Sequence, residues 1–418
     1  MNPFKKLPFR GSILVTLAVL ATSSNLYAQR AAEGDGEEEA ADVGTISEQN
    51  GRILSEAIEF LNMEQYAEAR ARLSDMRLDR LSPFERSRYE QLMFNLDMVN
   101  EDYPAARGHL QAAIDSGGLN PQEVSTMRYQ MAQLFVQEEK YPEAAAALEA
   151  WLATEPMPNS AAYYLLAASY YYQELYDKAL PPAQKAVELA GESPQEGWLS
   201  MLSSLLILKE DYAGAIPVLR RMVNLFPEKK AHWQQLSQLY IQVEDYKTGL
   251  VVMEFANHGG MLTEDREIRQ LSDLYMMQEM PYRSALLLES ALEEEKIEKN
   301  LRAYESLANA WVASREFEKA VPVLGQAAEL SDNGALYERM GEVLVQLENW
   351  EESIAAFENA IDKGDLRDTA YVQYLIGFSY FNLERYNEAR TWLQRAANSE
   401  EHRQNSRSML QLIDSKTN

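Results

Sequence analysis

The sequence predicts an all-α protein built as a stack of about ten helix-turn-helix repeats. Aromatic residues recur along the chain at intervals of 33 to 38 residues, and a small side chain follows each of them three residues later. The aromatic positions are Tyr66, Tyr103, Tyr141, Tyr176, Tyr212, Tyr246, Tyr282, Phe317, Trp350 and Tyr386. The small residues are Ala69, Ala106, Ala144, Ala179, Ala215, Gly249, Ala285, Ala320, Ser353 and Ala389. Because one helical pair cannot bury its own apolar face, each pair needs a neighbour on either side.

One repeat is clearest between Met127 and Pro156. Apolar residues at helical spacing mark a first helix, and a second set marks a second helix. These positions are Met131, Ala132 and Phe135 in the first helix and Tyr141, Ala144, Leu148 and Trp151 in the second. We expect the small residues Ala132 and Ala144 where the two backbones approach closely, with larger side chains filling the gaps around them.

The motif of each unit resembles the tetratricopeptide repeat over about residues 50 to 398. The best copies are Tyr163, Leu166, Ala167, Tyr170, Ala179 and Ala186; Trp233, Leu236, Tyr240 and Ala256; and Ile376, Gly377, Tyr380, Ala389, Leu393 and Ala396. The resemblance implies a right-handed superhelical solenoid whose first helices line a concave groove. The first two units match least well, as terminal units of a stack do when one face meets water.

Turn residues set the expected helix boundaries. Asp102, Asp211, Asp245 and Asn349 each precede the aromatic position, where a side-chain oxygen caps the second helix. Around Tyr282 the register is ambiguous, because the neighbouring residues fit better if that unit starts one residue earlier. Those residues are Leu271, Ser272, Tyr275, Ser284, Leu288 and Ala291.

The two ends of the chain differ from the repeats. Basic residues, an apolar run and a small residue at Ala28 predict that residues 1–28 form a signal peptide, cleaved after Ala28. The alternative is an uncleaved membrane anchor, although the run is shorter than the roughly 20 apolar residues that span a bilayer. Residues 29–49 are expected to form an acidic disordered linker and residues 50–398 the repeat array. Residues 399–418 are expected to form a capping helix and tail, with Met409, Leu412 and Ile413 at helical spacing.

The chain is strongly acidic. Its 418 residues carry a formal net charge of −26, and cleavage after Ala28 takes this to −29. Such a surface repels nucleic-acid phosphates and anionic lipids and attracts basic partners. The absence of cysteine excludes disulfides, thiol chemistry and a lipid anchor on cysteine. No apolar stretch after residue 28 is long enough to span a membrane. Because the signal peptide predicts export, the mature chain is expected to be periplasmic.

No residue pattern predicts catalysis. The histidines, which are His109, His232, His258 and His402, lie in different units, and none has a second histidine at metal-ligand spacing. Glycine-rich phosphate loops, metalloprotease motifs and serine-hydrolase motifs are absent from the sequence. The carboxylates of residues 33–42 do not have the spacing of a calcium-binding loop. We therefore expect no enzyme activity, no cofactor and no metal site.

The predicted binding surface is the groove lined by the first helices. Its tyrosine and amide positions are Tyr129, Gln133, Tyr164, Tyr171, Tyr172, Gln234, Gln238 and Gln242, and the last unit adds Tyr371 and Tyr374, with Phe378 and Phe381 beside them. Tyrosine offers a flat apolar ring with a polar tip, and glutamine both donates to and accepts from a peptide backbone. These properties suit an extended peptide. The alternative is packing between adjacent repeats, and for Tyr164, Tyr171 and Tyr172 neither role is favoured.

Some tetratricopeptide proteins bind a C-terminal carboxylate through a Lys or Arg and an Asn on successive first helices. Arg266, Arg269, Arg302 and Asn309 resemble this arrangement only in part, since acidic residues stand between them. We therefore do not expect this mode of binding here.

As a whole, the chain resembles the exported tetratricopeptide proteins that accompany TonB–ExbB–ExbD systems in gammaproteobacteria. The resemblance rests on the signal peptide, the acidic spacer and roughly ten degenerate repeats without a lipid anchor. It implies a non-catalytic periplasmic scaffold that assists TonB-dependent uptake of iron as siderophore complexes. The basic, proline-rich segment of TonB would then be a ligand of the acidic groove. The alternative is an adaptor in envelope, pilus or cell-wall assembly.

Overall fold

The computed structural model describes residues 44–417, and these residues form 21 α-helices, one short 3-10 helix and no strand. The predicted signal peptide and most of the predicted acidic linker lie outside the described residues. Between residues 44 and 417, every helix is too short or too polar to cross a membrane. The all-α repeat solenoid predicted from the sequence is confirmed.

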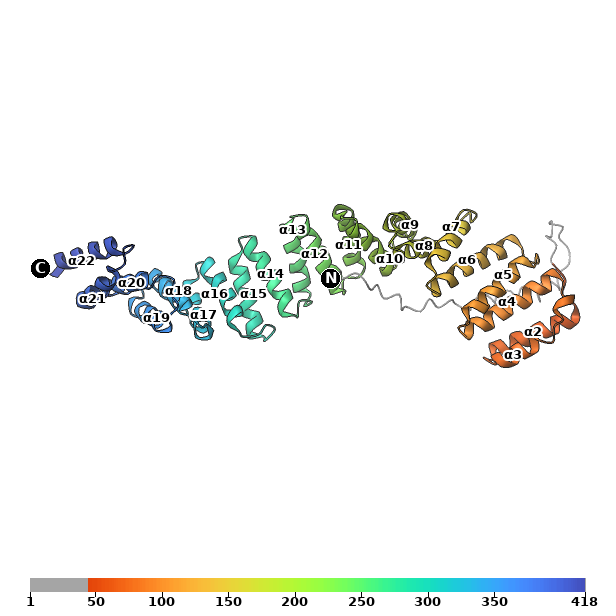
Figure 1. Cartoon of the computed structure of the whole chain (residues 1–418), viewed down its shortest axis with the longest axis horizontal. Helices are drawn as coiled ribbons and strands as arrows, with labels where there is room; N and C mark the ends of the chain where they lie inside the picture. The colour runs from red at the N-terminus through yellow and green to blue at the C-terminus, as the bar shows by residue number, and fades with distance from the viewer. Residues whose placement is uncertain (1–43, 418) are drawn as a thin grey trace. The chain divides into compact units, whose positions relative to one another are not determined.

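The chain divides into two compact units between Val218 and Leu219, a point that lies within α11 (Tyr212–Leu225). The first unit contains four helical pairs and a further first helix, α10 (Figure 1). These elements are α2 (Glu48–Asn62), α3 (Tyr66–Leu73), the 3-10 helix η1 (Leu78–Arg80), α4 (Pro83–Val99), α5 (Tyr103–Asp115), α6 (Pro121–Gln137), α7 (Tyr141–Leu152), α8 (Ser160–Tyr172), α9 (Tyr176–Leu189) and α10 (Glu196–Leu208). Each second helix packs on its own first helix and on the next one, and neighbouring first helices also touch, as α2 touches α4.

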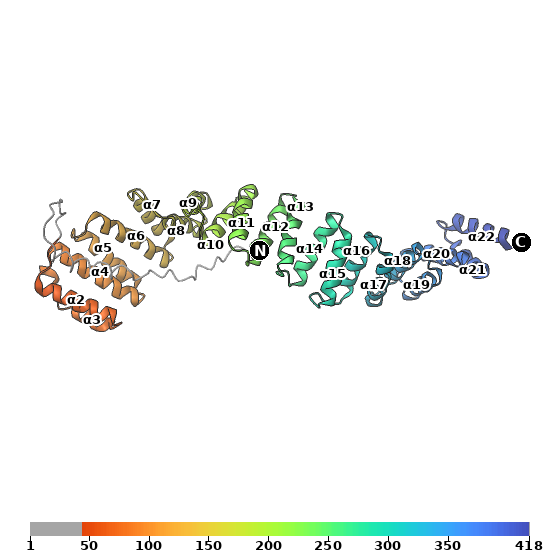
Figure 2. The same cartoon turned by 180° about the vertical axis from the view of Figure 1, so that it is seen from behind.

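The second unit repeats this arrangement with five helical pairs and a final single helix (Figure 2). The elements are α12 (Lys230–Gln242), α13 (Tyr246–His258), α14 (Asp265–Met277), α15 (Pro281–Glu293), α16 (Leu301–Ala313), α17 (Phe317–Leu330), α18 (Ala335–Gln346), α19 (Trp350–Lys363), α20 (Thr369–Asn382), α21 (Tyr386–Ala396) and α22 (Arg403–Thr417). Its helices pack in the same alternating order, and α22 contacts both α21 and α20.

Small residues lie where the two helices of a pair cross. Ala132 and Ala144 are fully buried, as the sequence predicts. The crossing of α18 and α19 has glycine at this position. A Cβ atom added to Gly341 would lie 2.5 Å from the ring of Phe357. Side chains larger than hydrogen therefore have no room at this crossing.

Nine of the ten predicted aromatic positions begin a second helix, and the exception is Tyr282. There α15 begins one residue earlier, at Pro281, so the earlier of the two possible registers holds. The small residue of this pair is Ser284, whose buried hydroxyl lies 2.8 Å from the hydroxyl of Ser272 on α14. The prediction that placed Tyr282 at the helix start is therefore wrong by one residue.

Each first helix is joined to its second helix by a turn that contains one residue in the left-handed conformation, with φ between 56° and 61°. In nine of the ten turns this residue is glutamate rather than glycine, and in the tenth it is Arg315. The glutamates are Glu64, Glu101, Glu139, Glu174, Glu210, Glu244, Glu279, Glu348 and Glu384. A residue with a Cβ atom pays roughly 1 kcal/mol for this conformation relative to glycine. The protein is therefore less stable than it would be with glycine at these turn positions.

This strain gives a testable prediction within one helical pair. Glu64→Gly relieves the left-handed turn after α2 and is expected to stabilise the protein by about 0.5–1 kcal/mol. Glu59→Gly, on the exposed face in the interior of the same helix, is expected to destabilise it by about as much. Thermal unfolding of the two variants measures both effects. A loss of stability in Glu64→Gly would contradict the strained turn.

Aspartates cap several of the second helices. Asp102, Asp211 and Asp245 each accept a hydrogen bond from the backbone N–H three residues later, at 3.2, 2.9 and 3.1 Å. These three predicted caps are confirmed. The predicted cap at Asn349 is wrong, because its side chain makes no capping hydrogen bond to α19.

At the start of the described chain, Glu85 joins α2 to α4. Its carboxylate accepts hydrogen bonds from the backbone N–H and hydroxyl of Ser47 at 2.9 and 2.8 Å and from the amide of Asn50 at 2.8 Å. It also accepts from the N–H of Ser82 at 2.9 Å, which completes a capping box on α4. Burial alone would raise the pKa of Glu85, but these donors lower it to about 2. The carboxylate therefore stays charged and holds the first pair in place.

At the other end, α22 packs on α21. Ile413 is fully buried in a cluster with Leu393, and Met409 is partly buried against the same cluster. Leu412 was expected at helical spacing with these residues, but 44% of its surface is exposed. Only one face of α22 therefore contributes to the apolar core, and the rest of the helix faces solvent.

Candidate functional site

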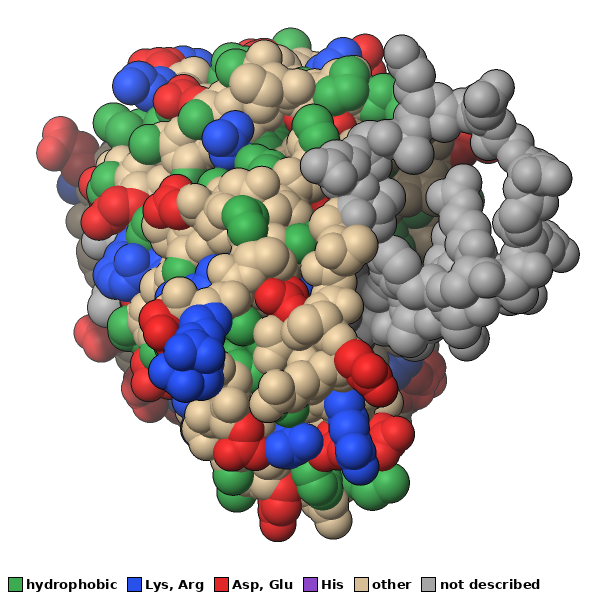
Figure 3. All heavy atoms as spheres, turned by 90° about the vertical axis from the view of Figure 1, so that its right-hand side faces the viewer, with side chains coloured by type: hydrophobic (Ala, Val, Ile, Leu, Met, Phe, Trp, Pro, Cys, Tyr) green, Lys and Arg blue, Asp and Glu red, His purple; other side chains and the backbone are tan. Residues whose placement is uncertain are grey.

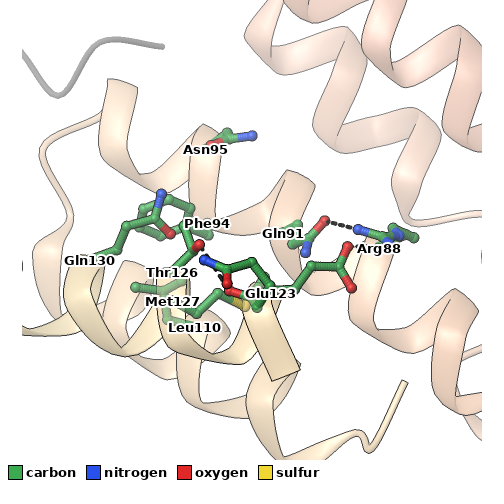
Figure 4. Close-up of a pocket in the computed structure, with 10 residues that line it drawn as sticks. Arg88, Gln91, Phe94, Asn95, Leu110, Glu123, Thr126, Met127 and Gln130 are labelled. Atoms are coloured by element: carbon green, nitrogen blue, oxygen red, sulfur yellow. Dashed lines mark hydrogen bonds and ion pairs between the residues drawn. The ribbon is translucent and has the colours of Figure 1, made fainter. Parts of the chain in front are cut away.

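The first unit has a pocket on its first helices, between α4 and α6, with a cavity volume of about 190 Å³ (Figure 4). Its polar lining consists of Gln91, Asn95, Gln122, Thr126 and Gln130. Its apolar lining consists of Phe94, Leu110 and Met127. The remaining lining residues are the oppositely charged Arg88 and Glu123. Amide and hydroxyl groups thus surround an apolar floor.

The two charges in this pocket neutralise each other. Arg88 lies 2.6 Å from the carboxylate of Glu123 and donates a second hydrogen bond, of 2.9 Å, to Gln91 (Figure 4). The guanidinium also lies over the ring of Phe84, 4.6 Å from its centroid. The other polar groups are amides and the hydroxyl of Thr126, which donates to the backbone oxygen of Gln122 at 3.0 Å. Amides donate and accept as a peptide backbone does. The pocket can therefore hold an uncharged, extended chain segment.

The sequence analysis did not select this pocket, although its signal is present. Gln91 and Asn95 stand ten and six residues before Glu101, the left-handed residue of their turn. Tyr129 and Gln133 have the same spacing in the next pair and were selected. The spacing from the turn would have identified Gln91 and Asn95.

Tyr129 lies on α6 next to this pocket and packs within its own helical pair. Its ring stacks on Trp151 with centroids 4.7 Å apart and planes 29° apart. The indole nitrogen of Trp151 donates to the backbone oxygen of Ser125 at 2.9 Å, which fixes the stack. Burial raises the pKa of Tyr129 to about 12, and a hydrogen bond with Gln133 offsets this in part. Tyr129 and Gln133 are both half-buried, so each still presents surface to solvent.

Three further tyrosines predicted to bind a peptide lie between helices of the first unit. Tyr172 stacks on Tyr141 of the preceding pair, with centroids 4.8 Å apart, and Tyr171 meets Tyr172 edge-on. Tyr164 lies 5.9 Å from Trp198 of the following pair. Burial raises the pKa of Tyr164 and Tyr172 to about 12. Tyr164 and Tyr172 therefore contact adjacent repeats, whereas Tyr171 meets rings of its own pair. All three side chains are half-buried, which leaves part of each at the surface.

The three predicted glutamines of α12 lie in the second unit. Gln234 donates a hydrogen bond of 2.6 Å to Glu267 on α14, so its amide already bridges two first helices. Glu267 also accepts from the backbone N–H of Thr263 at 3.0 Å and pairs with Lys230 at 2.7 Å. Gln238 and Gln242 are exposed. Gln234 therefore has a structural role, and the other two glutamines remain accessible.

Tyr371 and Tyr374 of α20 are covered on one side by His402. The imidazole centroid lies 5.7 Å from that of Tyr371 and 6.5 Å from that of Tyr374, with which it stacks. Phe378 contacts Trp350 of the preceding pair, and Phe381 contacts Tyr386 of its own pair. The predicted aromatic strip of the last unit thus packs largely against neighbouring elements.

A second hollow, of about 500 Å³, lies between α16, α18 and α20 in the second unit. It contains Arg315, Arg339, Glu342 and Tyr371 beside apolar side chains. Arg339 donates a hydrogen bond to Asn309 of α16. This hollow carries charged groups at its surface, unlike the neutral pocket between α4 and α6.

Buried charges in the first unit are balanced by neighbours. His109 contacts the carboxylate of Glu90 and lies 3.4 Å from that of Asp97. Arg86 pairs with Glu90 and Arg70 pairs with Asp97, both at 2.5 Å.

Seen from the end that carries α2 and α3, acidic and basic side chains alternate over the surface (Figure 3). This view shows no large patch of one charge.

The tetratricopeptide repeat family matches residues 129–195 and 339–406. The first segment spans α6 to α9, and the second runs from α18 to the start of α22. No curated protein sequence matches the chain.

Several solved structures are similar in fold. A tetratricopeptide repeat protein from Parabacteroides merdae is 17% identical, covers 62% of this chain and 99% of its own, and has a TM-score of 0.33. YrrB, described as a TPR protein with an unusual peptide-binding site, is 18% identical, with coverage of 47% and 97% and a TM-score of 0.34. The TPR2AB domain of yeast Sti1, described as a complex with pHSP90, is 16% identical, with coverage of 61% and 96% and a TM-score of 0.32. The chain is an all-α repeat solenoid in which residues 129–195 and 339–406 match the tetratricopeptide repeat.

Proposed function

We propose that this chain is a non-catalytic scaffold that binds an extended segment of a partner protein on its first helices. The observation that carries the proposal is the pocket between α4 and α6, whose amides surround an apolar floor and whose two charges pair with each other. An extended backbone presents both N–H and C=O groups, and the side chains of Gln91, Asn95 and Gln130 can satisfy both. The apolar floor then accepts one uncharged side chain of the partner.

The proposed location is the periplasm, and the proposed process is TonB-dependent energy transduction for iron uptake. The support comes from the sequence: the predicted signal peptide, the acidic spacer, and a net charge of −29 after cleavage at Ala28. The basic, proline-rich periplasmic segment of TonB suits an acidic protein in charge. TonB, ExbB and ExbD are therefore the partners to test first. An adaptor role in envelope, pilus or cell-wall assembly is the second candidate.

The proposal predicts that a double variant, Gln91→Ala with Asn95→Ala, loses its partner while the helical fold stays intact. Each lost hydrogen bond weakens binding by about 1 kcal/mol, so the pair lowers affinity roughly tenfold or more. The control is Gln111→Ala, an exposed amide on the second helix α5. The measurement is capture of the partner from crosslinked envelopes, with circular dichroism to verify folding. Equal capture by the double variant and the wild type would contradict the proposed site.

Growth on siderophore iron separates the two candidate processes. If the chain serves TonB, deletion is expected to slow this growth, and TonB peptides are expected among the crosslinked partners. Unchanged growth with every TonB paralogue removed in turn would contradict the TonB role. Capture of pilus or cell-wall enzyme subunits would then favour the assembly role.

A further inference from the structure

Three potential metal ligands that are far apart in the sequence meet beside the last helical pair. They are Asp368, which precedes α20, and Glu401 and His402, which precede α22. One ligand atom from each lies within 4.8 Å of the other two. The Nε2 atom of His402 lies 2.6 Å from a carboxylate oxygen of Asp368. The spacing of histidines along the sequence could not show this group, because its only imidazole meets two carboxylates.

Two of the three side chains are held in place by other contacts. Only 12% of the His402 side chain is exposed, because its ring packs on Tyr371 and Tyr374. The other carboxylate oxygen of Asp368 accepts a hydrogen bond from the backbone N–H of Tyr371 at 3.0 Å. Preorientation of this kind reduces the conformational entropy that a ligand-binding site must lose.

The surroundings have excess negative charge. Glu338 and Glu342 stand one turn apart on α18 near Asp368. Burial raises the pKa of Glu338, and the charges of Glu342 and Asp368 raise it further. In the described part of the chain, no lysine or arginine forms an ion pair with Glu338, Glu342 or Glu401. Glu338 and Glu342 therefore add negative charge beside Asp368.

We propose that Asp368, Glu401 and His402 bind a divalent transition-metal ion, with Zn²⁺ as the reference ion. Neutral imidazole and carboxylate oxygen are both ligands of zinc, at about 2.0–2.2 Å, and three protein ligands leave a fourth position for water. The imidazole of His402 would bind the ion through its unprotonated nitrogen and keep its proton on the other ring nitrogen. Small side-chain rotations bring the three ligand atoms from their present separations to one ion.

The bound ion would fasten the start of α22 to the start of α20. A chain without cysteine has no disulfide with which to close its last repeat. The final helix, α22, packs on the array through only one apolar face, so a metal link would stabilise its position. The role proposed for the metal is therefore structural.

The test is a calorimetric titration of the full chain with ZnCl₂, with variants that retain the local hydrogen bonds. His402→Gln keeps an N–H donor for Asp368, and Asp368→Asn keeps an oxygen that can cap α20. We expect one saturable equivalent in the wild type and binding weaker by about tenfold or more in both variants. His258→Gln, which removes an exposed histidine from the same unit, should bind like the wild type.

A second measurement separates a loss of zinc binding from a loss of stability in a variant. Zn²⁺ should raise the hydrogen-exchange protection of α22 in the wild type and leave it unchanged in His402→Gln. Three results would overturn the proposal. They are no saturable zinc binding by the wild type, equal binding by His402→Gln, and binding of Ca²⁺ in preference to Zn²⁺.

Discussion

Glu85→Ala is expected to destabilise the N-terminal helical pairs by about 3 kcal/mol. The substitution removes the acceptor for four donors that come from Ser47, Asn50 and Ser82. Glu85 is 5% exposed, so water cannot readily replace the lost bonds. Because each repeat is stabilised by its neighbours, α2 and α3 should unfold first. Urea unfolding and hydrogen exchange of α2 measure the change.

The same contact predicts a pH dependence. The pKa of Glu85 is lowered from 4.5 to about 2, so the charged carboxylate stabilises the fold fully above pH 4.5. This contribution is lost as the pH falls from about 4.5 through 2. Ser82→Ala is the matched control, because it removes the capping bond from the N–H of Glu85 at 3.2 Å and leaves the Glu85 carboxylate bonded to Ser47 and Asn50. An equal loss of stability in both variants would show that the link from Glu85 to α2 contributes nothing.

Gly341→Ala is expected to destabilise the second unit by about 1–3 kcal/mol. The added Cβ atom would lie 2.5 Å from the ring of Phe357, which is fully buried and cannot move into solvent. The α18–α19 pair must then separate slightly or distort the ring. Thermal unfolding followed by circular dichroism measures the loss.

Gly325→Ala is the matched control, in helix α17 of the same unit. Its nearest side-chain atom would be 3.8 Å from the new Cβ atom, at Met340. Alanine there is expected to stabilise the helix by about 0.5–1 kcal/mol, because glycine has the greater backbone entropy in the unfolded chain. Adding Phe357→Leu to Gly341→Ala should restore part of the loss if the clash is its cause. Opposite signs for the two glycines are the expected result, and equal effects would contradict the close crossing of α18 and α19.

Most of the fold follows from local sequence signals. An aromatic residue followed three positions later by a small residue recurs ten times, and nine of these aromatic residues begin a second helix. The aromatic pattern predicts a helix start at Tyr282, but α15 starts at Pro281, the position that an aromatic residue occupies in the other pairs. Asn349 has the residue type of a cap, but its side chain does not bond to α19. Residue type predicts a possible hydrogen bond and cannot establish its geometry.

The site was harder to predict. The left-handed turn residues were not identified, because glutamate has no preference for positive φ and glycine is the usual signal. Tyr172 and Tyr374 were selected by residue type, yet their contacts with Tyr141 and His402 depend on the tertiary arrangement. Asp368 and His402 meet across two helices, and no local pattern records that contact.

The most direct test of the binding surface is site-specific photocrosslinking in living cells. A crosslinking amino acid at Thr126, on the exposed edge of the α4–α6 pocket, is expected to give an adduct with one partner protein. The same residue at Ala146, exposed on the second helix α7, is expected to give none. The Thr126 adduct should disappear when Gln91 and Asn95 are replaced by alanine. An adduct at Ala146 but not at Thr126, or one unaffected by those substitutions, would contradict binding on the first helices.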